Sequence, residues 1–281
     1  MREKISFSEW RLYQDVCQHR WKLNYIDGNY QNVYSIHMDF GTAIHESIEK
    51  HKTRKDPVTQ DDASKFFEEK FKSLLEKNQS KYPERDKKTE PGIFVEAGKR
   101  IIANLNDCQE LVKAEVLYNE YELDVKIDRS DDADIRFKGY IDLVFKITDV
   151  KGKTILYVCD FKTCSWGWDK EKRRDRGVQS QLFLYKHFLC KKFNLDPKQV
   201  RCSFILLKKR PPKGSSPIEF FPISAGPISV QHALDDLNSD ITDMRDRLKN
   251  ETIQKNLKSC VNAYGDRCPY FQTKCWPDKK V

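Results

Sequence analysis

Alternating apolar and polar residues in the middle of the chain predict β-strands. From Phe137 to Ile147 the apolar side chains fall on one face, because successive residues of a strand point to opposite sides. Asp142 falls on the other face of this strand. The same pattern predicts strands near residues 118–128, 135–147, 154–162 and 201–208.

Helical periodicity surrounds these strands. Between Gly177 and Lys192, apolar side chains recur at the spacing of one buried helical face. A further helix opens at Phe40. Others are predicted at residues 6–25, 59–77, 93–117 and 229–250, with a polar linker at 78–92. Strands and helices in this order indicate an α/β or α+β core, with the early helices forming a lobe over one face.

The chain length sets the expected organisation. Its 281 residues suffice for one large core or for a core with a helical satellite. We expect a mainly helical N-terminal region at 1–117, a mixed core at 118–225, and a C-terminal helix with a cysteine cluster at 226–281. All three belong to one integrated domain in this interpretation.

The first candidate for chemistry is the segment Asp160-Phe161-Lys162, which ends a predicted strand. Asp160 and Lys162 share one face of the strand, whereas Phe161 points to the core. An antiparallel neighbour would place Asp142 beside Asp160. Two carboxylates and the Phe161 carbonyl are hard oxygen ligands suited to Mg²⁺, and Lys162 would stabilise an attacking hydroxide or a charged phosphate. The alternative for the triplet alone is a solvated strand face.

Two further polar residues stand on predicted apolar faces. Gln181 shares a buried stripe with Tyr185, four residues later, and a buried glutamine needs partners for its amide. His45 stands beside the buried side of the helix that opens at Phe40. The alternatives are a glutamine bonded to a backbone carbonyl and a purely structural histidine.

The order of these patterns resembles the PD-(D/E)XK nuclease superfamily, and especially its RecB-type branch of phage exonucleases and CRISPR adaptation nucleases. The resemblance covers roughly residues 40–190 and rests on Gly41-x-x-x-His45, Gly139-x-x-Asp142, Asp160-x-Lys162-Thr163 and Gln181-x-x-x-Tyr185. It implies a restriction-endonuclease-like mixed sheet flanked by helices, with an additional helical lobe and a nuclease core at 118–225.

The resemblance also implies a role for each matching residue. The ligands of Mg²⁺ or Mn²⁺ would be His45, Asp142, Asp160 and the Phe161 backbone carbonyl. Lys162 would be catalytic, and Gln181 and Tyr185 would position the site or the DNA backbone. Glu120 and Glu122 lie in a segment that resembles an acidic strand of relatives, and which of them faces inward is open.

The expected activity is that of a metal-dependent DNA nuclease. An exonuclease on DNA ends or single strands, in recombination, repair or replication, is favoured over an endonuclease. The alternative is a non-catalytic nucleic-acid-binding module on the same fold, although every charged motif position is present. A third possibility, an iron–sulfur redox or regulatory protein, rests on the cysteines alone.

The charge distribution agrees with a nucleic-acid partner. The chain has 51 basic and 43 acidic residues, a net charge of +8. A basic run follows the Asp-x-Lys strand, where cations would grip phosphates and an exposed aromatic ring would stack on a base. The predicted DNA-binding residues are Lys172, Arg173, Arg174, Arg176 and Trp166. A solvated loop with its tryptophan in the core is the alternative.

Nine cysteines form a separate pattern. Disulfide frameworks belong mainly to small secreted chains, and no apolar run approaches the roughly 18 residues of a membrane span. We therefore expect reduced thiols, no membrane, and a cytoplasmic location in a bacterium or a phage-infected host. No P-loop pattern is present, so a helicase or recombinase would act in trans on the same DNA. The oligomeric state is open.

Four of these cysteines resemble the iron–sulfur staple of RecB-type nucleases, which joins the two ends of the chain. The resemblance implies a [4Fe–4S] cluster on Cys17, Cys260, Cys268 and Cys275. The gaps of seven and six residues between the last three are wider than in the best-known members. Zn²⁺ in a four-cysteine site and thiols without metal are the alternatives.

Overall fold

The computed structural model describes residues 3–52, 58–128, 134–262 and 265–276. The chain divides into two compact units. The first contains residues 1–33, 123–139 and 230–281, and the second contains 34–122 and 140–229.

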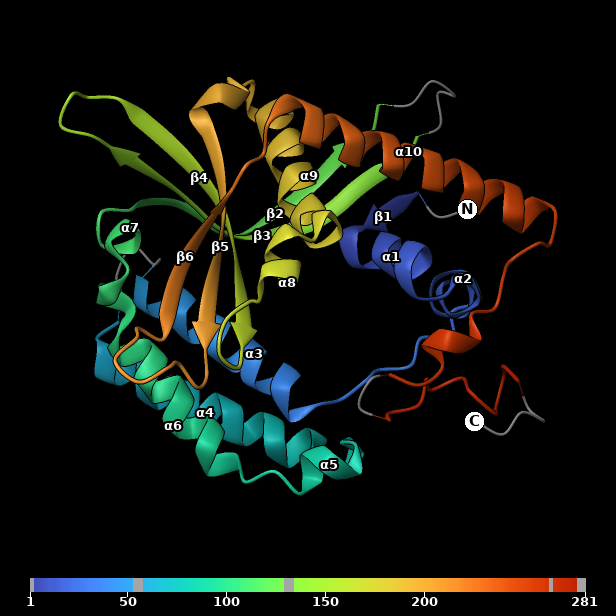
Figure 1. Ribbon diagram of the computed structural model, residues 1–281, viewed down its shortest axis with the longest axis horizontal. Helices are drawn as coiled ribbons and strands as arrows, with labels where there is room; N and C mark the ends of the chain where they lie inside the picture. The colour runs from blue at the N-terminus through green and yellow to red at the C-terminus, as the bar shows by residue number, and fades with distance from the viewer. Residues whose placement is uncertain (1–2, 53–57, 129–133, 263–264, 277–281) are drawn as a thin grey trace. The chain divides into compact units, whose positions relative to one another are not determined.

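A mixed sheet forms the centre of the second unit (Figure 1). In it, β3 (Arg136–Thr148) pairs antiparallel with β4 (Thr154–Cys164), and β4 pairs parallel with β5 (Val200–Lys208). β6 (Ile218–Ile223) lies antiparallel to β5, and β2 (Glu115–Lys126) pairs with β3. The four predicted strands and the mixed α/β class are confirmed. The unpredicted β6 contains Pro222, which a strand at the edge of a sheet tolerates.

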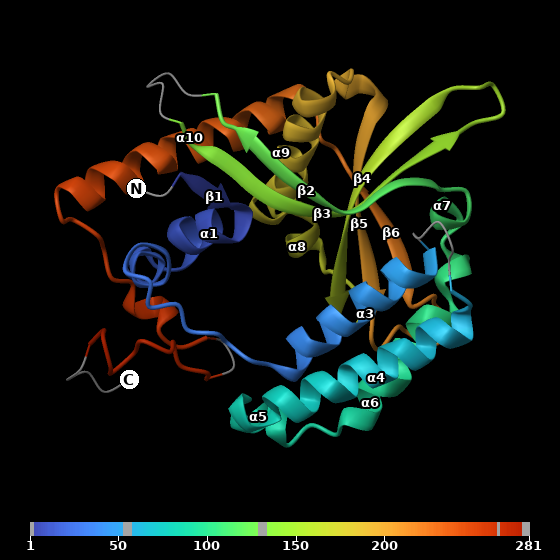
Figure 2. The same ribbon diagram turned by 180° about the vertical axis from the view of Figure 1, so that it is seen from behind.

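Helices cover both faces of this sheet (Figure 2). Three of them share one core with the sheet: α3 (Ile36–Lys52), α4 (Gln60–Asn78) and α6 (Pro91–Ala103). Cys159 and Phe161 of β4 point into that core, as predicted. The opposite face carries α9 (Arg176–Phe193), which contacts β4 and β5. Asp160 and Lys162 are therefore presented to α9, because side chains alternate along β4.

Local sequence fixes both ends of α9. The Asp175 carboxylate caps the first turn and accepts hydrogen bonds from the backbone N–H groups of Gly177 and Val178. The helix stops at Asn194, which adopts a left-handed conformation with φ 51°. Immediately before α9, much of the basic run forms a short helix, α8 (Lys170–Arg174), which is capped by Asp169.

The region before the sheet differs from the prediction. The helix predicted at 93–117 ends at Ala103, where the Asn104 amide donates to the carbonyl of Arg100 and caps the last turn. After the short α7 (Gln109–Val112), β2 begins at Glu115. The predicted linker at 78–92 contains α5 (Glu84–Lys87). Its Asp86 accepts the N–H of Ile36, so α3 starts four residues earlier than Phe40.

Gly98 allows α6 and α4 to approach closely. A methyl group built on Gly98 would lie 2.1 Å from the ring of Phe67. Gly98→Ala is expected to lower the free energy of unfolding by about 1–3 kcal/mol, because the packed ring must move. Gly92→Ala, in the same helix, is the matched control, since its nearest neighbour lies at 3.8 Å. Urea denaturation measures both, and equal stability of the two variants would contradict this packing.

The first unit contains β1 (Lys4–Ser6), which pairs parallel with the start of β3, and α10 (Pro227–Lys249). The predicted helix at 6–25 is interrupted at Cys17, whose backbone is extended. It therefore becomes α1 (Phe7–Arg11) and α2 (Gln18–Trp21), each followed by a wide π-helical turn. The C-terminal segment satisfies the backbone at this break: the Asn256 amide donates to the Val16 carbonyl over 2.8 Å.

Two side-chain contacts connect α1 and the turn after it to α10. The indole nitrogen of Trp10 donates to Asp240 over 2.6 Å, and the hydroxyl of Tyr13 donates to Asp243 over 2.5 Å. Among the helices in the described part of the chain, none combines the length and apolarity of a membrane span.

Candidate active site

The site forms where β3 and β4 separate. Their ladder runs from the Thr148–Thr154 pair to the Leu143–Cys159 pair, and Asp142 and Asp160 are the next residues beyond it. There the backbone N–H of Phe161 donates to Oδ2 of Asp142 over 2.7 Å. A carboxylate thus takes the position that a strand partner would occupy. The N–H and C=O of a strand residue leave by the same edge, so the Phe161 carbonyl also points toward this split.

The two carboxylates form an electrostatically strained pair. Asp160 is only 2% exposed. Burial and the charge of Asp160 raise the pKa of Asp142 well above its ordinary value. Buried Oδ2 of Asp160 accepts no hydrogen bond from the described residues, although Nζ of Lys162 lies 2.8 Å away. A cation between the carboxylates would relieve this repulsion.

These donors fit a divalent hard cation. Mg²⁺ uses one or two carboxylates and completes its shell with water and phosphate oxygens. Asp142, Asp160 and the Phe161 carbonyl provide such a set. No group of three or more His, Cys, Asp or Glu side chains in the described residues has the arrangement of a metal site as it stands. The fit therefore rests on the carboxylate pair.

Lys162 begins a chain of polar contacts that ends in the interior. Its Nζ donates to Oε1 of Gln181 over 3.0 Å, and the Gln181 amide donates to the hydroxyl of Tyr185 over 3.2 Å. Burial opposes the charge of Lys162, but the Asp160 carboxylate outweighs it and raises the pKa of Lys162. Tyr185 is buried, and this burial, followed by the charge of Asp160, raises its pKa. The lysine is therefore a charged donor held in one direction.

His45 enters the site from α3. Its Nδ1 lies 3.8 Å from Oδ2 of Asp142, and its ring centre lies 5.6 Å from that of Phe161. Burial lowers the pKa of His45 to about 4, against the pull of Asp160. A neutral imidazole has a free lone pair, so His45 is suited to a ligand or acceptor role at neutral pH.

Glu120 also faces the site, which the sequence left open. Burial and the charges of Glu49, Asp160 and Glu46, in that order, raise the pKa of Glu120. The charge of Glu120 in turn acts on Asp142. Its backbone has φ 44°, a left-handed conformation that is uncommon for a non-glycine residue inside a strand. This local distortion of β2 has no signature in the sequence.

The predicted DNA-binding residues lie beyond the end of β4 and in the helices after it. Trp166 is 66% exposed, and Lys172, Arg174 and Arg176 are exposed as well. Arg173 instead forms an ion pair of 2.7 Å with Glu219. Trp168 is buried against Phe204. Trp166 and the three exposed cations are therefore accessible to a ligand.

The four cysteines of the predicted staple gather in the first unit. The backbone of Cys268 donates to the carbonyl of Cys260 over 2.7 Å. Burial raises the pKa of the Cys260 thiol, and the nearby thiols of Cys268, Cys275 and Cys17 add to this. The four cysteines therefore lie near one another. Within the described residues, their present arrangement is not that of a metal site.

A family comparison agrees with this geometry. The model of the PD-(D/E)XK nuclease superfamily matches residues 4–273. The chain belongs to the PD-(D/E)XK nuclease superfamily. The match extends far beyond residues 40–190, on which the sequence resemblance rested, and confirms that resemblance.

Among solved structures, the nuclease chain is similar to a crystal structure from Eubacterium rectale that is provisionally named an exonuclease. The TM-score is 0.57 at 13% sequence identity, over 99% of this chain and 89% of the other. At this identity the likeness concerns the fold alone. No curated protein sequence matches the chain.

Proposed function

We propose that this nuclease hydrolyses phosphodiester bonds of DNA with Mg²⁺ or Mn²⁺. The observation that carries the proposal is the convergence of Asp142, Asp160 and Lys162 at the split between β3 and β4. Two buried carboxylates that repel one another and a charged lysine form a site for a cation and a phosphate. A non-catalytic binding module has no comparable need for such a strained pair.

Each residue has a distinct role in the proposed reaction. Asp142, Asp160, the Phe161 carbonyl and His45 would hold the cation, with Glu120 added as a nearby acidic group. When bound, the cation supplies a more acidic water and neutralises charge on the phosphate. Lys162 would donate hydrogen bonds to the attacking oxygen or to the phosphate oxygens as negative charge develops.

Gln181 and Tyr185 act as positioning residues in this scheme. Gln181 accepts a hydrogen bond from Lys162, which directs the ammonium group toward the carboxylates. The hydroxyl of Tyr185 holds the glutamine amide in turn. Because both side chains belong to one rigid helix, Lys162 needs little reorganisation when the substrate arrives.

We favour exonuclease action on DNA ends or single strands. The exposed ring of Trp166 follows the catalytic strand and is accessible for stacking on an unpaired base. The provisional name of the structurally similar protein agrees with this choice. A helicase or recombinase acting in trans would supply such substrates in recombination, repair or replication.

Linear and circular DNA distinguish the proposed alternatives. Metal-stripped protein is incubated with end-labelled linear single strands, linear duplex and circular single strands, in Mg²⁺, Mn²⁺ or EDTA. We expect degradation of linear DNA in either metal, release of label as short products, and none of this in EDTA. Equal cutting of circular DNA would contradict the exonuclease assignment. DNA binding without cleavage in any metal would instead favour the binding module.

We further propose that Cys17, Cys260, Cys268 and Cys275 hold a metal that stabilises the first unit. Burial raises the pKa of Cys260 and the other three thiols add to this, which supports a close grouping of the four side chains. All nine cysteines are free, in agreement with the expected reduced thiols. An iron–sulfur cluster is the favoured occupant and Zn²⁺ the alternative.

Replacing one of these thiols is expected to release the metal. Cys275→Ser would remove most of the bound iron or zinc and destabilise the first unit by several kcal/mol, since structural metals contribute folding free energy. The matched control is Cys108→Ser in the second unit, because both thiols are 5% exposed. Metal analysis and visible absorbance after anaerobic purification measure the outcome. Metal-free wild-type protein of normal stability would contradict the proposal.

A further inference from the structure

A small cavity lies at the end of the sheet, outside the carboxylate site. It has a volume of about 230 Å³ and is bordered by the start of α3, the segment leading into α6 and the residues that follow β4 and β5. Ile93, Phe94 and Ala97 form its apolar wall. The polar side chains are those of His37, Thr89, Ser165, Lys209 and Arg210. Among the described residues, two cations and two hydroxyls line it, and no carboxylate does.

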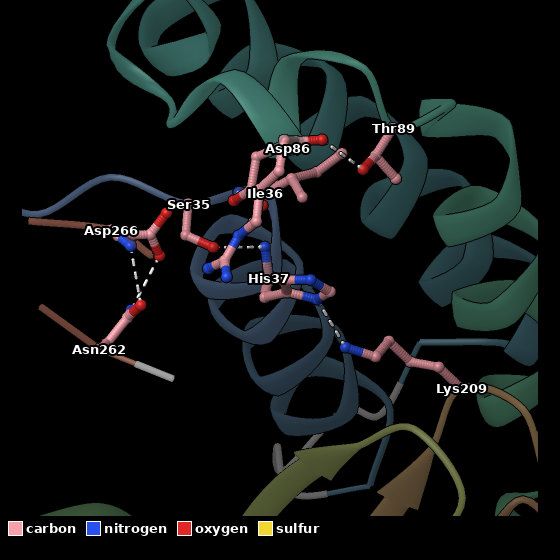
Figure 3. Close-up of polar contacts among 9 residues, drawn as sticks. Ser35, Ile36, His37, Asp86, Thr89, Lys209, Asn262 and Asp266 are labelled. Carbon is pink, nitrogen blue, oxygen red and sulfur yellow. Dashed lines mark hydrogen bonds and ion pairs between the residues drawn. The ribbon is translucent and has the colours of Figure 1, made fainter. Parts of the chain in front are cut away.

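Lys209 lines this cavity, and its ammonium group is directed at the ring of His37 (Figure 3). Its Nζ lies 2.9 Å from Nδ1 of His37 and 5.3 Å from the ring centre of Phe94. Burial lowers the pKa of Lys209, and burial followed by the charge of Lys209 lowers that of His37. In the part of the chain that the structure describes, Lys209 forms no ion pair. A partly desolvated ammonium group of this kind favours an anion.

Asp86, a carboxylate whose charge acts on Lys209, is already engaged by other groups. Asp86 accepts the backbone N–H of Ile36 over 3.2 Å and lies 3.3 Å from Nε of Arg85. An adjoining wider hollow, of about 710 Å³, shares Lys209 and Arg210 but carries three glutamates. The smaller cavity is therefore the better place for an anion.

The cavity lies at the end of the strands that carry the proposed reaction centre, on the side of the sheet that α6 covers, whereas Lys162 faces α9. β4 and β5 run parallel, with Lys162 opposite Leu206, and both strands end at this edge. Lys209 lies three residues beyond Leu206, or roughly 10 Å along the strand. Ser165 is three residues beyond Lys162, and the exposed Trp166 follows it. Ligands commonly bind beyond the carboxyl ends of parallel strands.

We propose that the cavity formed by His37, Thr89, Lys209 and Arg210 binds the terminal phosphate of a DNA strand. The inference rests on the proposed nuclease function and adds recognition of a phosphorylated end. A terminal phosphate monoester carries about −1.5 to −2 charges at neutral pH and three free oxygens. It can therefore meet both cations, whereas an internal phosphodiester has one charge and a chain on both sides. The Thr89 hydroxyl borders the cavity and donates to the Arg85 carbonyl over 3.1 Å. Trp166 would stack on a base near that end.

Binding without cleavage tests this directly. Anisotropy in EDTA compares labelled single strands that carry a 5′-phosphate, a 3′-phosphate or only hydroxyl ends. We expect one phosphorylated end to bind wild type at least about tenfold more tightly than the hydroxyl end, as charge-assisted hydrogen bonds allow. Lys209→Gln should abolish the preference. Arg210→Gln, at an exposed position that does not endanger folding, should weaken it.

Lys213→Gln is the matched control, because it removes the same charge from an exposed position of the turn outside the cavity. It should keep the wild-type preference. Equal affinity of wild type for all three ends, or a preference unchanged in both Lys209→Gln and Arg210→Gln, would overturn the proposal. Competition by inorganic phosphate alone, with no preference among DNA ends, would assign the cavity to free phosphate and overturn it too.

Cleavage assays separate this inference from the proposed function. With Mn²⁺, Lys209→Gln should raise KM for the preferred phosphorylated strand about tenfold and leave kcat within about twofold. Absence of cleavage by wild type, with the end preference intact in EDTA, would reject the nuclease function alone. Normal cleavage without end preference would reject the cavity alone.

Discussion

Lys162→Ala is expected to lower the rate of DNA hydrolysis by about 10²–10³-fold, the usual cost of removing a donor that stabilises transition-state charge. The ammonium group contacts Asp160 at 2.8 Å and donates to Gln181 at 3.0 Å, so its direction is fixed before substrate binds. Single-turnover cleavage measures the chemical step. DNA affinity in EDTA should change little, because the predicted DNA-binding cations Lys172, Arg174 and Arg176 are unchanged.

Two further variants make the Lys162 result specific. Lys146→Ala removes a partly exposed lysine from β3, where it pairs with Glu115 at 2.8 Å, and should leave cleavage unchanged. Lys162→Gln removes the same charge but keeps an amide that can contact Gln181 and donate to the buried Asp160, whereas alanine leaves both without a polar partner. Cleavage at the wild-type rate by Lys162→Gln or Lys162→Ala would contradict the assigned role.

Asp142→Asn is expected to abolish metal-dependent hydrolysis and to stabilise the metal-free protein. Burial and Asp160 raise the pKa of Asp142, so its carboxylate form is unfavourable in the folded state. Asparagine removes that charge and keeps an oxygen for the Phe161 N–H. Thermal unfolding in EDTA should show a higher midpoint, by roughly 2–4 °C for each kcal/mol of repulsion relieved.

The stability difference between Asp142→Asn and wild type depends on pH, because the pKa of Asp142 is raised in the folded state. A raised carboxyl pKa favours the folded state at low pH, and that contribution is lost as the pH rises through the raised value. The advantage of Asp142→Asn should therefore be largest near pH 8 and should shrink toward pH 4. Mg²⁺ or Mn²⁺ should raise the midpoint of wild type only. Lower stability of the variant in EDTA at pH 8 would contradict the strained carboxylate pair.

Much of the site could be predicted because it depends on local periodicity. Period-two alternation placed Asp160 and Lys162 on one face of β4, and the four-residue helical spacing placed Gln181 beside Tyr185. The contact of Lys162 with Asp160 and the hydrogen bond from the Gln181 amide to the Tyr185 hydroxyl agree with these two expectations. The proposed chemical roles of these residues stay predictions.

Other features depend on tertiary contacts that periodicity does not encode. The break at Cys17 is satisfied by Asn256, more than two hundred residues later. Glu120 faces the site through one left-handed residue in β2. The cavity unites His37 and Lys209, which are 172 positions apart. The first and third features join residues far apart in the sequence, and the second is a distortion of one residue, so periodicity contains no nearby signal for them.

We propose that Asp142, Asp160 and Lys162 form one metal-dependent hydrolytic site. Its most direct test is single-turnover cleavage of end-labelled linear DNA by metal-stripped wild type, Asp142→Asn and Lys162→Ala purified in parallel. We expect that Mn²⁺ or Mg²⁺ starts cleavage in wild type, that EDTA stops it, and that both variants remain at least about a hundredfold slower. Cleavage that persists in EDTA, or that is equal in all three proteins, would contradict it.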